Sequence, residues 1–206
     1  MAFEKSVFIN CPFDDAYYGL LRPTLFTVIY LGLKPRIALE RSDSGEQRIT
    51  KIIELIRESK YSIHDLSRLK ARKSGEFFRL NMPFELGIDV GCRNFGTGRL
   101  RQKRLLVLEA ERFRYQAALS DISGSDIVSH RNEPEQITTA VRNWLAEHCC
   151  PEAPGPAKVW GAFTDFMADN YDKLKARGYS DENIDDLPMP ELMGCIGDWV
   201  AEDAKQ

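Results

Sequence analysis

Features of several common protein classes are missing from this sequence of 206 residues. The five cysteines are an odd number without Cys-x-x-Cys spacing, which argues against a disulfide framework or a zinc knuckle. The three histidines have no ligand-like spacing, so we expect no metal site. No apolar leader follows Met1, and the most apolar stretch, residues 20–33, is too short to cross a bilayer. These absences favour a reduced, cytoplasmic protein with no membrane contact.

A strong positive charge is missing as well. The formal net charge is -3, so no overall field draws the chain to nucleic acid or to a membrane surface. The composition, 43% hydrophobic and 29% charged, is ordinary for a globular protein. No Gly-x-Gly-x-x-Gly motif occurs, which argues against the usual dinucleotide site of redox enzymes.

Short apolar runs alternate with helical periodicity along the first 150 residues. The runs cover residues 6–10, 36–40, 61–66 and 104–109, with a shorter fifth run at 127–128. Between the second and third, Ile49, Ile52, Ile53 and Ile56 recur at helical spacing and predict an amphipathic helix facing the core. Strands that alternate with helices predict a doubly wound parallel sheet with helices on both faces, an α/β fold.

A stiff segment, residues 150–156, divides the chain. It contains three prolines and one glycine in seven residues. We therefore expect an α/β domain at residues 1–150 and a helical extension at 151–206, with two amphipathic helices. A piece of this size buries little apolar surface on its own. We therefore expect it to pack on the main domain or on a second subunit.

Polar residues stand where the predicted strands end. In an open parallel sheet, ligands bind outside the carboxyl ends of the strands, where the strand order reverses. If the first and third strands are neighbours, Asn10, Asp65 and Glu85 converge at that edge. The turn after the first strand adds Cys11 and Phe13.

The segment Asn81–Gly91 reads as the opening of a helix, with Asn81 as its cap and Pro83 in its first turn. Gly87 and Gly91 form a bare stripe for close approach of a backbone or ligand. Glu85 has two interpretations. It stabilises the positive end of the helix dipole, or it is a catalytic carboxylate beside a ribose, where it would stabilise an oxocarbenium-like transition state.

Other candidate residues also keep two interpretations. Asp65 either closes an Asx turn with Ser67 or binds ribose. His64 alternates with Asp65, so a core or surface histidine is favoured over a base. Cys11 reads as a small loop residue more readily than as a nucleophile, since no base is evident beside it. The basic loop 68–79 is either solvated or closes over a phosphate-bearing ligand.

Two families resemble this pattern. The first strand with its turn, Val7-Phe8-Ile9-Asn10, resembles the opening of TIR domains, and the helix of Glu85 resembles their catalytic helix. Glu85-Leu86-Gly87 is similar to the Glu-x-Gly pattern of nucleoside 2-deoxyribosyltransferases. Both families have flavodoxin-like folds and cleave N-glycosidic bonds.

The resemblance implies a NAD-consuming N-glycosidase, a hydrolase or cyclase of the kind found in bacterial antiphage defence. Glu85 would be the catalytic residue and NAD a substrate, with no separate cofactor. The nucleotide pocket would be lined by Asn10, Cys11, Phe13, Asp65 and Asn81, with Phe13 stacking on a base. A homo-oligomer or a partner effector protein is expected. The alternatives are a nucleoside N-glycosidase or 2-deoxyribosyltransferase, and a non-catalytic nucleotide sensor or adaptor.

Overall fold

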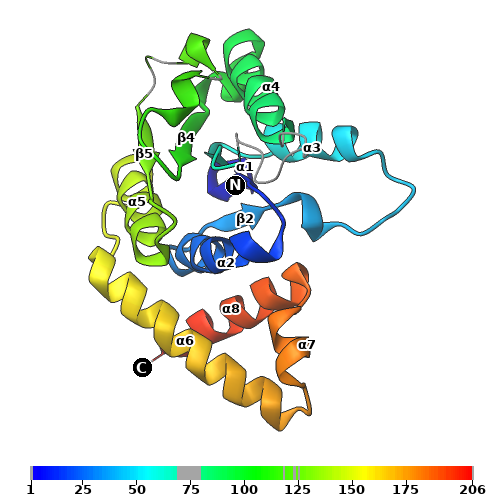
Figure 1. The fold of residues 1–206 in the computed structure, drawn as a ribbon, viewed down its shortest axis with the longest axis vertical. Helices are drawn as coiled ribbons and strands as arrows, with labels where there is room; N and C mark the ends of the chain where they lie inside the picture. The colour runs from blue at the N-terminus through cyan, green and yellow to red at the C-terminus, as the bar shows by residue number, and fades with distance from the viewer. Residues whose placement is uncertain (1, 69–79, 118, 123, 125, 206) are drawn as a thin grey trace.

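The protein folds around a five-stranded parallel sheet in the order β2-β1-β3-β4-β5. The computed structural model describes residues 2–68, 80–117, 119–122, 124 and 126–205. The strands are β1 (Ser6–Asn10), β2 (Lys34–Arg36), β3 (Tyr61–Asp65), β4 (Arg104–Glu109) and β5 (Ile127–Ser129). This strand order confirms the predicted flavodoxin-like, doubly wound fold, with β1 beside β3 (Figure 1).

Helices cover both faces of the sheet because the side chains of a strand alternate between its faces. From β1, Val7 and Ile9 point into a core shared with α2 (Asp15–Tyr30) and α5 (Pro134–His148). Phe8, between them, points into a second core shared with α3 (Arg48–Arg57). The helix α4 (Asn81–Phe95) packs beside α3 on that face, and a short helix, α1 (Ala2–Lys5), precedes β1.

The predicted second strand at residues 36–40 is wrong in position. The strand ends at Arg36, and Ala38–Glu40 form a 3-10 turn. An ion pair explains the change, because the carboxylate of Glu40 lies 2.9 Å from the guanidinium of Arg36 and also accepts from the backbone N–H of Ile37 at 3.2 Å. These contacts bend the chain where the apolar run favoured an extended one.

Two details of the predicted helices also differ. In α3, Ile52 and Ile56 are buried as expected, but Ile49 and Ile53 are exposed and Leu55 takes their place in the core. In α4, Asn81 is the first helical residue and is exposed; the preceding Leu80 occupies the cap position, and no side chain caps the helix. The expected asparagine cap is therefore wrong.

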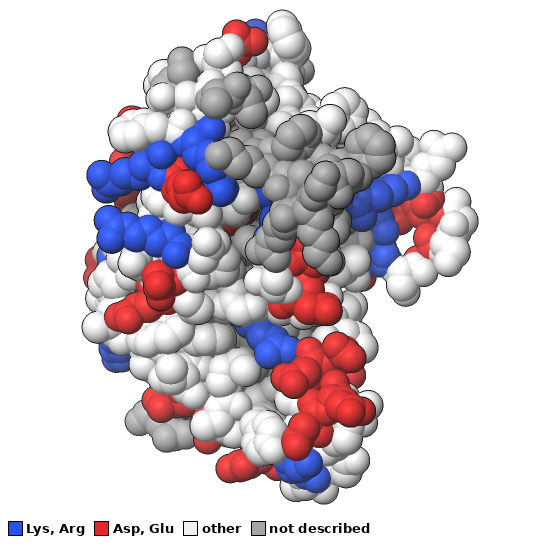
Figure 2. Space-filling view, in the orientation of Figure 1, with Lys and Arg blue, Asp and Glu red and all other residues white. Residues whose placement is uncertain are grey.

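The C-terminal segment packs on the sheet domain, which was one of the two expected arrangements. It forms α6 (Pro156–Ala176), α7 (Asp181–Asp185) and α8 (Met189–Asp203), of which the short α7 was not expected. Phe26 of α2 lies 5.5 Å, centroid to centroid, from Phe163 and Phe166, and 5.8 Å from Trp199. These helices cover the outer side of α2 in Figure 1. Acidic side chains gather over α7, at the lower right of Figure 2.

No helix among the described residues is long and apolar enough to cross a membrane. Within the same residues, no three His, Cys, Asp or Glu side chains gather closely enough to hold a metal ion. The cysteines are all free thiols.

Candidate functional site

The candidate site lies where the chain leaves β1 and β3 toward opposite faces of the sheet. After β1 the chain enters α2 on one face, and after β3 it continues to α4 on the other. Such a reversal leaves a crevice at the carboxyl edge of a parallel sheet. An ion pair joins the two loops, since Arg68 Nη2 lies 2.8 Å from Asp14 Oδ1. The remainder of the basic loop, residues 69–79, lies outside the described residues.

Glu85 is buried on the second turn of α4, with only 5% of its surface exposed. Burial raises the pKa of its carboxyl group, and the charge of Arg48 opposes that rise. Arg48 Nη2 lies 3.7 Å from Glu85 Oε1, and its own side chain is 52% exposed. Glu85 is therefore a carboxylate largely withdrawn from water, with a half-exposed cation at its side.

Asn10 fixes the start of α4. Its buried amide nitrogen donates to the carbonyl oxygen of Met82 at 2.9 Å and lies 3.0 Å from His64 Nδ1. Because an amide nitrogen only donates, His64 Nδ1 accepts and the ring proton sits on Nε2. The Asn10 amide thus holds the backbone of α4 at Met82, three residues before Glu85.

A buried polar chain continues from His64 beneath α4. His64 Nε2 lies 3.1 Å from Asp89 Oδ2, and Lys103 Nζ lies 3.2 Å from Asp89 Oδ1. Burial alone would raise the pKa of Asp89, but the hydrogen bond from His64 and the charge of Lys103 hold it below its ordinary value. The interpretation of His64 as a core histidine is confirmed, since its ring is fully buried.

Asp65 points to the opposite face and is fully engaged there. It accepts from the backbone N–H of Ser67 at 2.8 Å, which confirms the Asx turn, and from the hydroxyl of Tyr17 at 2.5 Å. His130 Nε2 lies 2.9 Å from Asp65 Oδ2. Burial would raise the pKa of Asp65, yet these hydrogen bonds and His130 lower it.

The histidine of this cluster does not complete a Ser-His-Asp triad. His130 Nδ1 accepts from the backbone N–H of Asn132, so Nε2 carries the proton. Ser67 Oγ lies 3.0 Å from that same nitrogen, which also faces Asp65. A triad needs the two partners on different ring nitrogens, so the cluster holds the chain in place and does not activate a serine.

Cys11, the residue after β1, is buried. Burial raises the pKa of its thiol, and the charges of Asp65, Glu85 and Asp14 raise it further. A thiol in such surroundings stays protonated, which supports the interpretation of Cys11 as a structural loop residue. The charges of Asp65 and Glu85, which lie on opposite faces of the sheet, both raise the pKa of this thiol.

The other two proposed binding residues differ in burial. Phe13 is partly buried and packs against both hydrophobic cores, so its ring bridges the two faces of the sheet. Asn81 is exposed at the start of α4.

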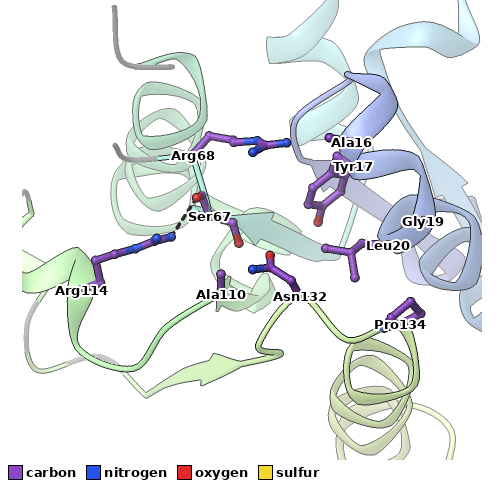
Figure 3. Close-up of a pocket in the computed structure, with 10 residues that line it drawn as sticks. All are labelled: Ala16, Tyr17, Gly19, Leu20, Ser67, Arg68, Ala110, Arg114, Asn132 and Pro134. Carbon is purple, nitrogen blue, oxygen red and sulfur yellow. Dashed lines mark hydrogen bonds between the residues drawn. The ribbon is translucent and has the colours of Figure 1, made fainter. Parts of the chain in front are cut away.

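A cavity of about 410 Å³ opens at the same edge, on the α2 side (Figure 3). Its polar lining comes from the ends of several elements, and Glu85 is not among its described lining residues. The polar lining residues are Tyr17, Ser67, Arg68, Arg114 and Asn132. Arg114 reaches in from the far side and donates to the carbonyl oxygen of Ser67 at 2.8 Å.

Sequence reasoning missed four polar residues of this edge, namely Tyr17, Arg114, His130 and Asn132. The position of His130 could have indicated its role, because it directly follows β5. Asn10 and Asp65 occupy the same kind of position, at the ends of β1 and β3. Arg114 pairs with Glu109 at the end of β4. It lies in the irregular segment after that strand, where hydrophobic periodicity predicts no position for a side chain.

No protein-family model, curated protein or solved structure matches this chain. The chemistry must therefore be argued from the edge itself. A buried carboxylate at a sheet's ligand-binding edge can stabilise a positive charge that develops on a bound molecule.

Proposed function

We propose that this protein is an N-glycosidase that consumes NAD, with Glu85 as its catalytic residue. The observation that carries the proposal is the position of Glu85, 5% exposed at the strand-order reversal of the sheet. A carboxylate that only stabilised the helix dipole would lie at the surface, where it keeps its hydration and has no desolvation cost. Among the described residues, Glu85 pairs with Arg48 alone, and a buried carboxylate with so few partners is typical of a functional group.

The reaction breaks the bond between C1′ of the ribose and the nicotinamide nitrogen. The bonding electrons leave with nicotinamide, which departs neutral, and an oxocarbenium-like ribosyl cation develops. Ionised Glu85 stabilises that cation, and the charge of Arg48 favours the ionised form by opposing the rise in the pKa of Glu85 that burial causes. Water then adds to C1′ and releases a proton to the solvent, which gives ADP-ribose, or a nucleophile of the same molecule attacks C1′ and closes a ring.

The buried chain beneath α4 supports this assignment. Asp89 lies one helical turn beyond Glu85 and on the same face, so its contacts with His64 and Lys103 hold that face against the sheet. Asn10 holds the first turn through Met82. In this proposal Asn10 is a positioning residue and touches no nucleotide. A homo-oligomer or an effector protein remains the expected partner.

The test is incubation of the full chain with NAD, with the products separated by chromatography and identified by mass. Glu85→Gln keeps the size of the side chain and should abolish nicotinamide release. Glu147→Gln is the matched control, since Glu147 is an exposed glutamate on α5, and it should keep full activity. The mass of the second product separates hydrolysis from cyclisation.

Equal nicotinamide release by wild type and Glu85→Gln would refute the role of Glu85. Transfer between deoxynucleosides, with NAD left intact, would favour the 2-deoxyribosyltransferase alternative, which the Glu85-Leu86-Gly87 pattern also fits. Nucleotide binding without turnover of either substrate would favour the sensor or adaptor.

A further inference from the structure

The charged side chains that line the 410 Å³ cavity are both arginines. Arg68 and Arg114 are among its described lining residues, whereas the carboxylates that pair with them, Asp14 and Glu109, are not. These carboxylates fix the two guanidinium groups from outside the cavity. The surface that a ligand meets is therefore rich in hydrogen-bond donors.

Arg68 keeps unused donor capacity. Its Nη2 donates to Asp14, while its Nε is buried and has no hydrogen-bond partner among the described residues. Because Nε is withdrawn from the surface, a ligand would reach the terminal nitrogens of Arg68, of which Nη2 already has Asp14 as a described partner. By contrast, Arg114 donates to Glu109, Glu111 and the carbonyl of Ser67, so it is held rigidly at the cavity wall.

Further donors come from the opposite side of the cavity. The amide of Asn132 points inward in Figure 3, from a residue with a positive φ of 59°. The first turns of α2 and α5 contribute Ala16 and Pro134 to the lining, and neither helix has a side-chain cap hydrogen bond. Their dipoles add partial positive charge at the cavity.

We propose that this cavity binds the phosphate-bearing part of the nucleotide substrate. The inference rests on the proposed function for the identity of that substrate, but the phosphate site stands on the cavity alone. The volume falls within the range of about 300–1,000 Å³ usual for small-molecule sites. Arginine donors in a fixed arrangement recognise phosphate oxygens.

The cavity and Glu85 belong to one edge of the sheet. Ser67, Arg68 and Ala110 line the cavity just after β3 and β4 end, and Asn10 at the end of β1 donates to the first turn of α4. A dinucleotide with its phosphates at Arg68 would extend across the strand-order reversal toward Glu85. A deoxynucleoside has no phosphate to use these donors, so the cavity favours NAD over the transferase substrates.

The experiment is calorimetric titration of the full chain with ADP and with adenosine. ADP should bind at least about tenfold more tightly than adenosine, because charge-assisted hydrogen bonds to phosphate are lost in the nucleoside. Arg68→Gln should weaken ADP binding about tenfold or more and leave adenosine binding unchanged. Arg104→Gln is the matched control, since Arg104 is exposed at the amino end of β4.

Equal affinities for ADP and adenosine, no ADP binding at millimolar concentration, or equal effects of Arg68→Gln and Arg104→Gln would overturn the proposal. If Arg68→Gln fails to fold because it strands Asp14, the double variant Asp14→Asn/Arg68→Gln removes both charges and gives the same test. Glu85→Gln should bind ADP like wild type. ADP binding without NAD cleavage would thus refute the catalytic proposal alone, and NAD cleavage without a phosphate preference would refute this one alone.

Discussion

The buried pair of Asp89 and Lys103 should dominate the stability of the α4 side of the sheet. Both side chains are fully excluded from water, and their charged atoms lie 3.2 Å apart. Lys103 Nζ also donates to the carbonyl oxygens of Ile56 and Ser59. These carbonyls cannot neutralise the ammonium group, so Asp89 is its charge partner.

Asp89→Asn keeps the shape of the side chain but leaves Lys103 as an unpaired buried charge. Breaking a buried pair in this way destabilises a protein by about 3–5 kcal/mol, whereas replacing both partners with neutral groups is often nearly neutral. A loss of that size is a large part of the roughly 5–15 kcal/mol that stabilises a typical protein. The double variant Asp89→Asn/Lys103→Met should therefore be more stable than Asp89→Asn.

Urea unfolding followed by circular dichroism measures these differences. The surface pair Lys173 and Glu202 is the control, because its atoms lie 2.7 Å apart but its side chains are 55% and 61% exposed. Removing that pair should change stability by about 1 kcal/mol or less. A loss below about 1 kcal/mol in Asp89→Asn, or a double variant that loses the sum of both single losses, would refute the reasoning.

The same pair predicts a dependence on pH. The folded pKa of Asp89 is below its ordinary value of 3.8, so its charge contributes stability above that value. That contribution is lost as the pH falls through the lower folded pKa. Wild type should therefore lose stability in acid more steeply than Asp89→Asn, with the two curves converging at the lowest pH.

Two further predictions concern α4. Burial raises the pKa of Glu85 above its ordinary value of 4.5, so wild type should lose stability relative to Glu85→Gln as the pH rises from 4.5 through the folded pKa. Urea unfolding at pH 4 should show the two proteins equally stable. At pH 7 the variant should be the more stable protein. Gly87→Ala should stabilise the protein by about 0.5–1 kcal/mol, since an added Cβ meets no described atom within 4 Å. Gly96→Ala should destabilise it, because a Cβ there would meet the Cys92 carbonyl. Thermal unfolding compares the two variants, and a destabilised Gly87→Ala would mean that the fold needs the stripe of Gly87 and Gly91 without side chains.

The sheet could be predicted because buried parallel strands are short and apolar on both faces. The runs at β1, β3 and β4 have this character, and their alternation with helices favours one topology. The strand predicted at residues 36–40 was wrong because the ion pair between Arg36 and Glu40 favours a turn. A single ion pair cannot be predicted from the spacing of apolar residues.

The orientation of polar residues at the strand ends could not be predicted. Asn10 pairs in register with His64, one residue before Asp65, so the side chains of Asn10 and Asp65 leave the sheet on opposite faces. Only the register reveals this, because a shift of one residue moves every side chain to the other face. The three residues therefore do not meet on one face, because Asp65 contacts Tyr17 of α2, whereas Asn10 contacts α4, the helix that carries Glu85.

The orientation of α4 also runs against its hydrophobicity. Its outward stripe is apolar, with Leu80, Phe84 and Phe95 exposed at 65%, 60% and 89%, while Glu85 and Asp89 face the sheet. A rotation of α4 that buried Phe84 would expose both carboxylates, together with the buried Met82 and Leu86. Contacts of Asp89 with His64 and Lys103 and of Asn10 with the first turn oppose that rotation. A helix held in this orientation keeps a carboxylate at the ligand-binding edge, which is why we assign the chemistry to Glu85.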